Sequence, residues 1–112
     1  MSNPAKRKGT AFESAVVAHL KAQGIPARRV AQTGAVDTGD IHGVSPFVLQ
    51  CKAYKNVTDG LREGIEGAQR QAVAAGEPYG AAVVKRPRKS IADAYVVLTL
   101  DDFARLLSDR LR

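Results

Sequence analysis

Two short strand-like segments joined by a turn constrain the fold of this chain more than any other sequence feature. Residues 39–44 and 47–52 are rich in apolar side chains, and only Ser45 and Pro46 separate them. A two-residue connection of this kind predicts an antiparallel β-hairpin. The hairpin fixes which side chains share a face, so it also determines where polar residues can gather.

The polar residues of this hairpin are expected on one patch. Side chains alternate along a strand, so Leu49 and Cys51 point to one face while Gln50 and Lys52 point to the other. A hairpin that is symmetric about the turn places Asp40 opposite Gln50. Asp40, Gln50 and Lys52 are therefore predicted to converge.

The rest of the chain alternates between helical and strand-like patterns. Phe103, Leu106 and Leu107 are expected to face inward from the last helix. The element order is predicted as α-β-β-β-α-β-β-α, an α/β fold in which one mixed sheet carries helices on its faces. Apolar periodicity and turn residues predict helices over 10–23, 58–75 and 100–111, an extended segment over 25–30, and strands over 80–84 and 94–99.

Length and charge point to one domain with a polyanionic partner. The 112 residues are enough for a single hydrophobic core, and they carry a net charge of +6. Such a charge favours nucleic acid as the partner. Residues 1–8 include Lys6, Arg7 and Lys8 without an apolar pattern, so we expect a mobile basic arm before a domain at 9–112.

Several other classes of protein are disfavoured. One cysteine and two histidines exclude an internal disulfide and a structural zinc finger. No apolar run is long enough to span a membrane, and the first residues lack the apolar core of a signal peptide, so a cytoplasmic location without membrane contact is expected. With aromatic residues at only 5%, a platform for stacking unpaired bases is poorly supplied.

The hairpin patch suits metal-assisted phosphodiester hydrolysis. Magnesium prefers oxygen ligands, which Asp40 and Glu13 can supply, and Gln50 adds an uncharged amide oxygen. The backbone carbonyl of Cys51 is a further ligand candidate. Lys52 is placed to orient the attacking water and to offset charge on the phosphate.

These residues resemble the motifs of the PD-(D/E)XK nuclease superfamily. The resemblance rests on Glu13 in an opening helix, on Gly39-Asp40-Ile41 in a strand, and on Gln50-Cys51-Lys52 in the next strand. It implies a restriction-endonuclease-like fold and a nuclease that uses Mg²⁺, with Mn²⁺ as a substitute. It also implies that Glu13, Asp40, Gln50 and Lys52 are the catalytic residues.

Within the superfamily, the chain is most similar to the Holliday junction resolvases of archaea and phages, over roughly residues 9–107. This implies a homodimer that cuts four-way DNA junctions, with Val83, Val97 and the last helix as candidates for the interface. Gly39 replaces the usual proline, a change expected to matter little. Gln50 replaces the usual acid, as in Mrr-like restriction nucleases, and it favours one metal ion over two.

A set of basic and hydroxyl residues is predicted to contact DNA phosphates. Arg29 and Thr33 are assigned by the resemblance to the loop before the catalytic aspartate, where the family contacts the scissile region. The set comprises Lys6, Arg7, Lys8, Arg28, Arg29, Thr33, Lys85, Arg86, Arg88 and Lys89.

Each candidate also has a purely structural interpretation. In this interpretation Glu13 pairs with Thr10 as a helix capping box, and Asp40 is an ordinary turn acid. Gln50 and Lys52 are then solvated strand residues. His42 shares a face with Asp40, and it is either a metal ligand or a partly exposed residue without a functional role.

Two further alternatives concern the basic loop and the second helix. In the first alternative, the basic loop is only a solvated surface. In the second, the whole protein is a nucleic-acid-binding module without catalysis. The second predicted helix is expected to expose Arg62, Gln69, Arg70 and Gln71.

Overall fold

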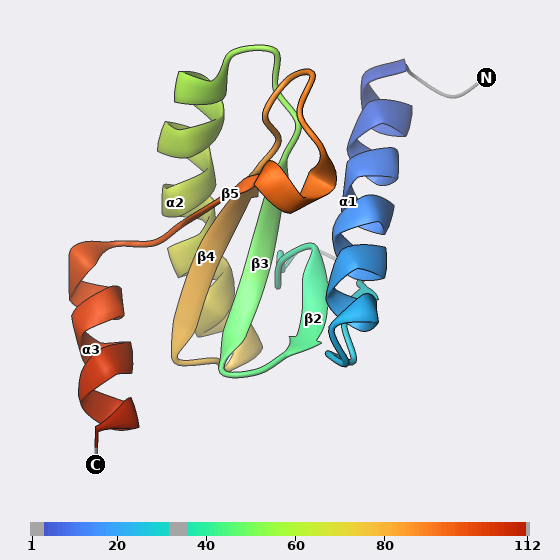
Figure 1. The fold of residues 1–112 in the computed structure, drawn as a ribbon. Helices are drawn as coiled ribbons and strands as arrows, with labels where there is room; N and C mark the ends of the chain where they lie inside the picture. Colours follow the sequence, from blue (N-terminus) through green and yellow to red (C-terminus); the bar gives the residue numbers. More distant parts are fainter. Residues whose placement is uncertain (1–3, 32–35, 112) are drawn as a thin grey trace.

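The fold is a mixed five-stranded sheet with helices on its two faces. The computed structural model describes residues 4–31 and 36–111. The strand order is β1-β2-β3-β4-β5, and Figure 1 shows α1 and α2 on opposite sides of the sheet. The predicted element order and α/β class are confirmed. The elements are α1 (Pro4–Ala22), β1 (Arg28–Arg29), β2 (Ile41–Val44), β3 (Phe47–Lys52), α2 (Val57–Ala75), β4 (Tyr79–Val84), a 3₁₀ turn at Ile91–Asp93, β5 (Tyr95–Val97) and α3 (Leu100–Arg110).

The predicted hairpin forms the centre of the sheet. Strands β2 and β3 are antiparallel with Ile41 opposite Leu49, as expected. Strand β3 then runs parallel to β4, and α2 makes the crossover between them. The carboxyl ends of β3 and β4 therefore lie at the same edge of the sheet, next to the residue that precedes β2.

The two faces of β3 belong to different halves of the core. Leu49 packs with Phe12 and Val16 of α1, and this cluster includes Ile41 and Val83. On the opposite face, Lys52 lies against the glycines of α2. The predicted alternation of β3 is thus confirmed.

The glycines of α2 allow this helix to approach the sheet closely. Gly60, Gly64 and Gly67 are all buried. A Cβ atom on Gly64 would lie 2.8 Å from the Cβ of Ala82, whereas a Cβ on Gly67 would meet nothing closer than 3.8 Å. Close packing at Gly64 therefore offsets the low helix propensity of glycine.

These two glycines provide a matched test of the packing. Both changes to alanine gain about 1 kcal/mol of helix propensity, so their difference isolates the steric contact. We expect Gly64→Ala to be less stable than Gly67→Ala by about 1–3 kcal/mol in urea unfolding. Equal stability of the two variants would contradict the packing of α2 described above.

Several helix ends differ from the predicted ones. Helix α1 begins at Pro4, so residues 4–8 of the predicted arm are helical and the expected start near Gly9 is wrong. Proline is well suited to a first helical position, and Lys and Arg are good helix formers. Helix α2 is capped by Asn56, whose side chain accepts a hydrogen bond from the N–H of Asp59, and it ends at Gly76 as predicted.

Helix α3 does not bury the residues that its pattern indicates. Phe103 and Leu107 are each about half exposed, at 46% and 47%, while Asp102 is buried. The helix is held by polar contacts instead: Tyr79 donates a hydrogen bond of 2.6 Å to Asp109, and the Arg105 guanidinium lies over the Tyr79 ring. The inward orientation predicted for Phe103 and Leu107 is wrong. Among the described residues, no helix is both long and apolar enough to cross a membrane.

Candidate active site

Asp40 is held beside the end of β3 by backbone hydrogen bonds. Its own N–H donates to the carbonyl of Leu49 over 3.0 Å. The N–H of Cys51 donates to Asp40 Oδ2 over 2.8 Å. This second bond fixes the carboxylate, rather than the backbone alone, so Asp40 is more than a turn residue.

Glu13 approaches the same place from α1. Its carboxylate lies 3.5 Å from Nε of Arg29, and its side chain is 21% exposed. Thr10 lies inside the helix, because α1 begins at Pro4. The capping-box interpretation of Glu13 is therefore wrong, and Glu13 is a mid-helix acid that faces β1 and Asp40.

Burial raises the pKa of both carboxyl groups, and in each case a neighbouring acid adds to the effect. For Glu13 the main cause of the raised pKa is burial, followed by the charge of Asp40, with Arg29 acting in the opposite direction. For Asp40 burial again raises the pKa most, and the Cys51 N–H, Lys52 and Arg29 lower it while Asp37 raises it. A half-buried pair of acids, in which the charge of Asp40 opposes the ionisation of Glu13, makes a site that a bound cation would stabilise.

Gln50 has an unsatisfied oxygen on the other face of β3 from the α1 core. Its side chain lies on the α2 face of β3, near Gly67, and its Oε1 is buried without a hydrogen-bond partner. A buried amide oxygen of this kind costs free energy unless water or a cation satisfies it. The residues therefore fit a hydrated magnesium ion, which needs few direct protein ligands. Among the described residues, no three His, Cys, Asp or Glu side chains form a metal cluster.

Lys52 belongs to a polar network that the sequence did not reveal. Its Nζ donates to the hydroxyl of Tyr54 over 3.4 Å, and that hydroxyl donates to Glu63 Oε2 over 2.7 Å. The ammonium also lies 5.3 Å from the centre of the Tyr54 ring. Tyr54 and Glu63 thus hold Lys52 at the end of β3, a position that no spacing rule indicates.

An open groove of about 600 Å³ begins at Lys52. It is lined by Lys8 of α1, by Lys52 and Lys55 at and after the end of β3, and by Asn56 and Asp59 at the start of α2. Three lysines therefore face one hollow, together with one acid. A groove of this charge is complementary to a phosphate backbone.

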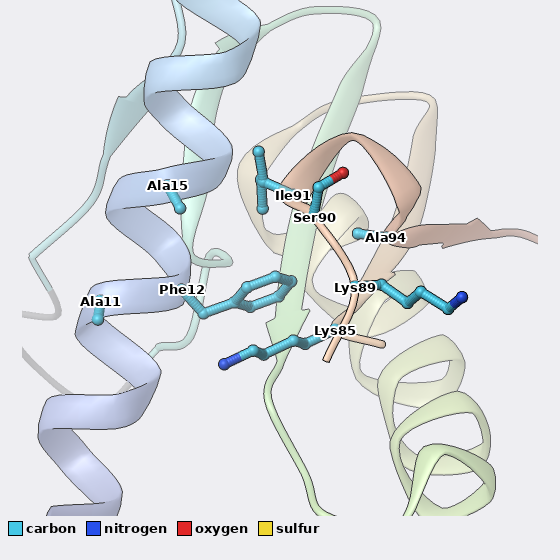
Figure 2. A pocket seen from close by; sticks show the side chains of 8 residues that line it. All are labelled: Ala11, Phe12, Ala15, Lys85, Lys89, Ser90, Ile91 and Ala94. Carbon is cyan, nitrogen blue, oxygen red and sulfur yellow. The ribbon is translucent and has the colours of Figure 1, made fainter. Parts of the chain in front are cut away.

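The basic residues after β4 meet the same edge of the sheet. The N–H of Lys85 donates to the carbonyl of Lys52 over 2.9 Å. A second, smaller hollow has a volume of about 200 Å³. Figure 2 shows three of the side chains that line it, Phe12 of α1, Lys85 and Ile91. Arg86 is engaged differently, because its guanidinium lies 4.6 Å from the centre of the Tyr95 ring.

The remaining predicted DNA contacts fall into two groups. The exposed residues are Arg7, Lys8, Arg28, Arg29, Arg88 and Lys89. Thr33 and the side chain of Lys6 lie outside the described residues. Arg28 pairs with His42 across β1 and β2, away from the Lys52 groove.

His42 and Cys51 have structural roles. A ring nitrogen of His42 lies 2.7 Å from the carbonyl of Thr38, which accounts for its position on β2. The Cys51 thiol is part of the α1 side of the core, and burial together with Asp40 and Glu13 raises its pKa strongly. A thiol in that environment is a poor nucleophile.

Comparison of the chain with protein-family models, curated proteins and solved structures gives no match. Any function assigned to the chain must therefore come from the chemistry of the site itself. The structure brings Glu13, Asp40 and Lys52 into electrostatic contact, and it places Gln50 on the neighbouring face with an unsatisfied oxygen.

Proposed function

We propose that the protein is a magnesium-dependent DNA endonuclease that cuts branched DNA, with four-way junctions as the main substrate. The observation that carries the proposal is Asp40, which lies within electrostatic reach of both Glu13 and Lys52, together with the lysine-lined groove that begins at Lys52. Neighbouring, partly buried acids suit a cation, and the lysines suit the phosphates around a scissile bond.

Each residue has a defined part in this proposal. Asp40 and Glu13 would hold the ion, with Gln50 as an uncharged partner to the ion or to its water. When bound, Mg²⁺ supplies Lewis-acid activation of the phosphodiester and of water. Lys52, held by Tyr54, offsets charge that develops on the phosphate and orients the attacking water.

The lysines of the groove bind the DNA on either side of the reacting phosphate. Lys8 and Lys55 line the groove, and Lys85 lies at the same edge of the sheet, where its N–H donates to the Lys52 carbonyl. Such contacts position a duplex without reading its sequence. This favours recognition of DNA shape over sequence-specific cutting by an Mrr-like nuclease.

A junction has two equivalent strands to cut, so the proposal includes a two-fold dimer. The exposed apolar side chains Val96, Phe103 and Leu107 lie on β5 and α3 and favour this side of the molecule as the interface. Val83, a candidate from the sequence, is only 4% exposed and belongs to the core. It is therefore not available to a partner.

The direct test is cleavage of a labelled four-way junction and of a linear duplex with the same arms, in Mg²⁺ and in chelator. The proposal predicts paired, symmetric cuts that appear only on the junction and only with the metal. Cuts on the linear duplex alone would overturn the junction assignment. Tight binding without cuts in Mg²⁺ or Mn²⁺ would instead support a binding module without catalysis.

The groove predicts a defined salt dependence of binding. Each phosphate contact contributes about 0.9 to the slope of log K against log salt, so Lys55→Ala with Lys85→Ala should reduce the slope by about two. Fluorescence anisotropy on an uncut junction in chelator measures this slope. Lys21→Ala, in the last turn of α1, is the matched control and should leave the slope unchanged. An equal effect of the control would show that the lysines act only through net charge.

A further inference from the structure

A buried glutamine of α2 is linked to the loop before Asp40. Gln71 is only 3% exposed, although its helix position predicted a solvent-facing side chain. Its Nε2 donates a 2.7 Å hydrogen bond to Asp37 Oδ2. The other oxygen of the same carboxylate accepts the N–H of Gly39 over 2.9 Å. One carboxylate thus connects helix α2 to the peptide that leads into Asp40.

This connection acts at an unusual backbone conformation. Gly39 has a φ of +100°, a conformation that side chains rarely adopt, and its N–H points to Asp37. Asp40 follows at once, and its carboxylate then meets the Cys51 N–H. The direction of the Gly39 peptide therefore helps to decide where the Asp40 carboxylate lies. Hydrogen bonds to a charged acceptor are among the stronger ones, so the Asp37 carboxylate suits this role.

We propose that Gln71 is a positioning residue for Asp40, acting through Asp37 and the Gly39 peptide. The inference rests on the proposed function for its link to magnesium. In metal sites, partners outside the ligand set orient the ligands, and their loss typically lowers metal affinity about 10–100-fold. Gln71 would hold the loop before β2 in the geometry that presents Asp40 to the ion.

An exchange of hydrogen-bonding polarity tests this role. Gln71→Glu places a carboxylate against Asp37 and breaks the bond, whereas Asp37→Asn keeps it after the Gln71 amide turns over. In the double variant the introduced asparagine amide can donate to the introduced glutamate carboxylate, so the bond returns with donor and acceptor exchanged. Gln69→Glu, an exposed position on the same helix, controls for the added charge.

Two measurements on these variants test the positioning role of Gln71. Amide hydrogen exchange of Gly39 reports the loop without metal, and calorimetric titration of the free protein with Mg²⁺ reports affinity. In Gln71→Glu we expect the amide hydrogen of Gly39 to exchange about tenfold faster, as for one lost hydrogen bond. We also expect this variant to bind Mg²⁺ about 10–100-fold more weakly. The double variant should recover most of both, and Gln69→Glu should change neither.

The results separate the two proposals. Unchanged Gly39 exchange and Mg²⁺ affinity in Gln71→Glu, or no recovery in the double variant, would overturn the positioning role. If Gln71→Glu does not fold, recovery of folding in the double variant supports the role, and its absence contradicts it. If the wild-type protein neither binds Mg²⁺ nor cuts DNA, the proposed function fails, yet Gly39 exchange still shows whether Gln71 positions the loop.

Discussion

Replacing Asp40 by asparagine is expected to abolish cleavage and, at neutral pH without metal, to stabilise the protein. Asparagine keeps an oxygen that accepts the Cys51 N–H, but it removes the charge that burial and Asp37 oppose. It also removes a metal ligand and the associated stabilisation of the reacting phosphate. We expect junction cleavage to fall about 10²–10³-fold or more.

The pH dependence of this gain has a definite sign. The pKa of Asp40 is raised in the folded state by burial, so its contribution to stability is present below its ordinary pKa of 3.8 and is lost as pH rises through the folded value. Wild type and variant should therefore have similar stability at about pH 3, and the variant should be more stable at about pH 7. Thermal unfolding in chelator measures both conditions.

The same thermal unfolding is then measured with Mg²⁺ in place of the chelator. A ligand that binds only the folded state raises the unfolding temperature, so Mg²⁺ should stabilise the wild type and leave Asp40→Asn unchanged. Asp101→Asn is a suitable control, because Asp101 lies exposed in the first turn of α3, where its charge interacts favourably with the helix dipole. This variant should be slightly less stable than the wild type at neutral pH, whereas Asp40→Asn should be more stable. A loss of stability in Asp40→Asn would contradict the electrostatic description of the site.

The sequence predicts the hairpin and its patch because both depend on local rules. Strand alternation and a two-residue turn placed Leu49 on one face and Lys52 on the other, and the structure confirms that division. The position of Asp40 beside the end of β3 follows from the same register. Local periodicity is sufficient wherever neighbours in space are also neighbours across one turn.

Other features depended on contacts that no local pattern contains. Gln71 lies on a helix, and its polar partner Asp37 is 34 residues away in sequence, so its burial could not be seen in the spacing. The apolar stripe of α3 was visible, but periodicity indicates only that a stripe exists. Polar contacts to Tyr79 place the helix so that Phe103 and Leu107 remain exposed.

The start of α1 shows a different limit. The apolar pattern begins at Phe12, which packs on the sheet. Residues 4–8 carry no apolar stripe in their sequence, and they extend the helix through the propensity of Ala, Lys and Arg. A boundary based on apolar residues therefore detects the packed part of a helix and misses its extension.

Replacing Gly39 by proline is expected to unfold the protein. On the resemblance expected from the sequence, glycine in place of a usual proline was predicted to matter little. The structure gives Gly39 a conformation that proline cannot adopt. Gly39 has a φ of +100°, and its N–H donates to Asp37, whereas proline fixes φ near −65° and has no N–H.

We expect Gly39→Pro to lose more than about 4 kcal/mol of unfolding free energy, enough to leave little folded protein. Gly39→Ala retains the N–H but places a Cβ in steric overlap with Val48 Cγ1, so its loss of stability should be intermediate. Gly76→Ala has a similar φ of +73° with nothing within 4 Å, and it isolates the backbone cost of about 1 kcal/mol. Urea unfolding followed by circular dichroism orders the three variants. A folded Gly39→Pro protein with wild-type stability would show that the loop before β2 accepts the arrangement of proline-bearing nucleases, and it would remove the structural reason for glycine here.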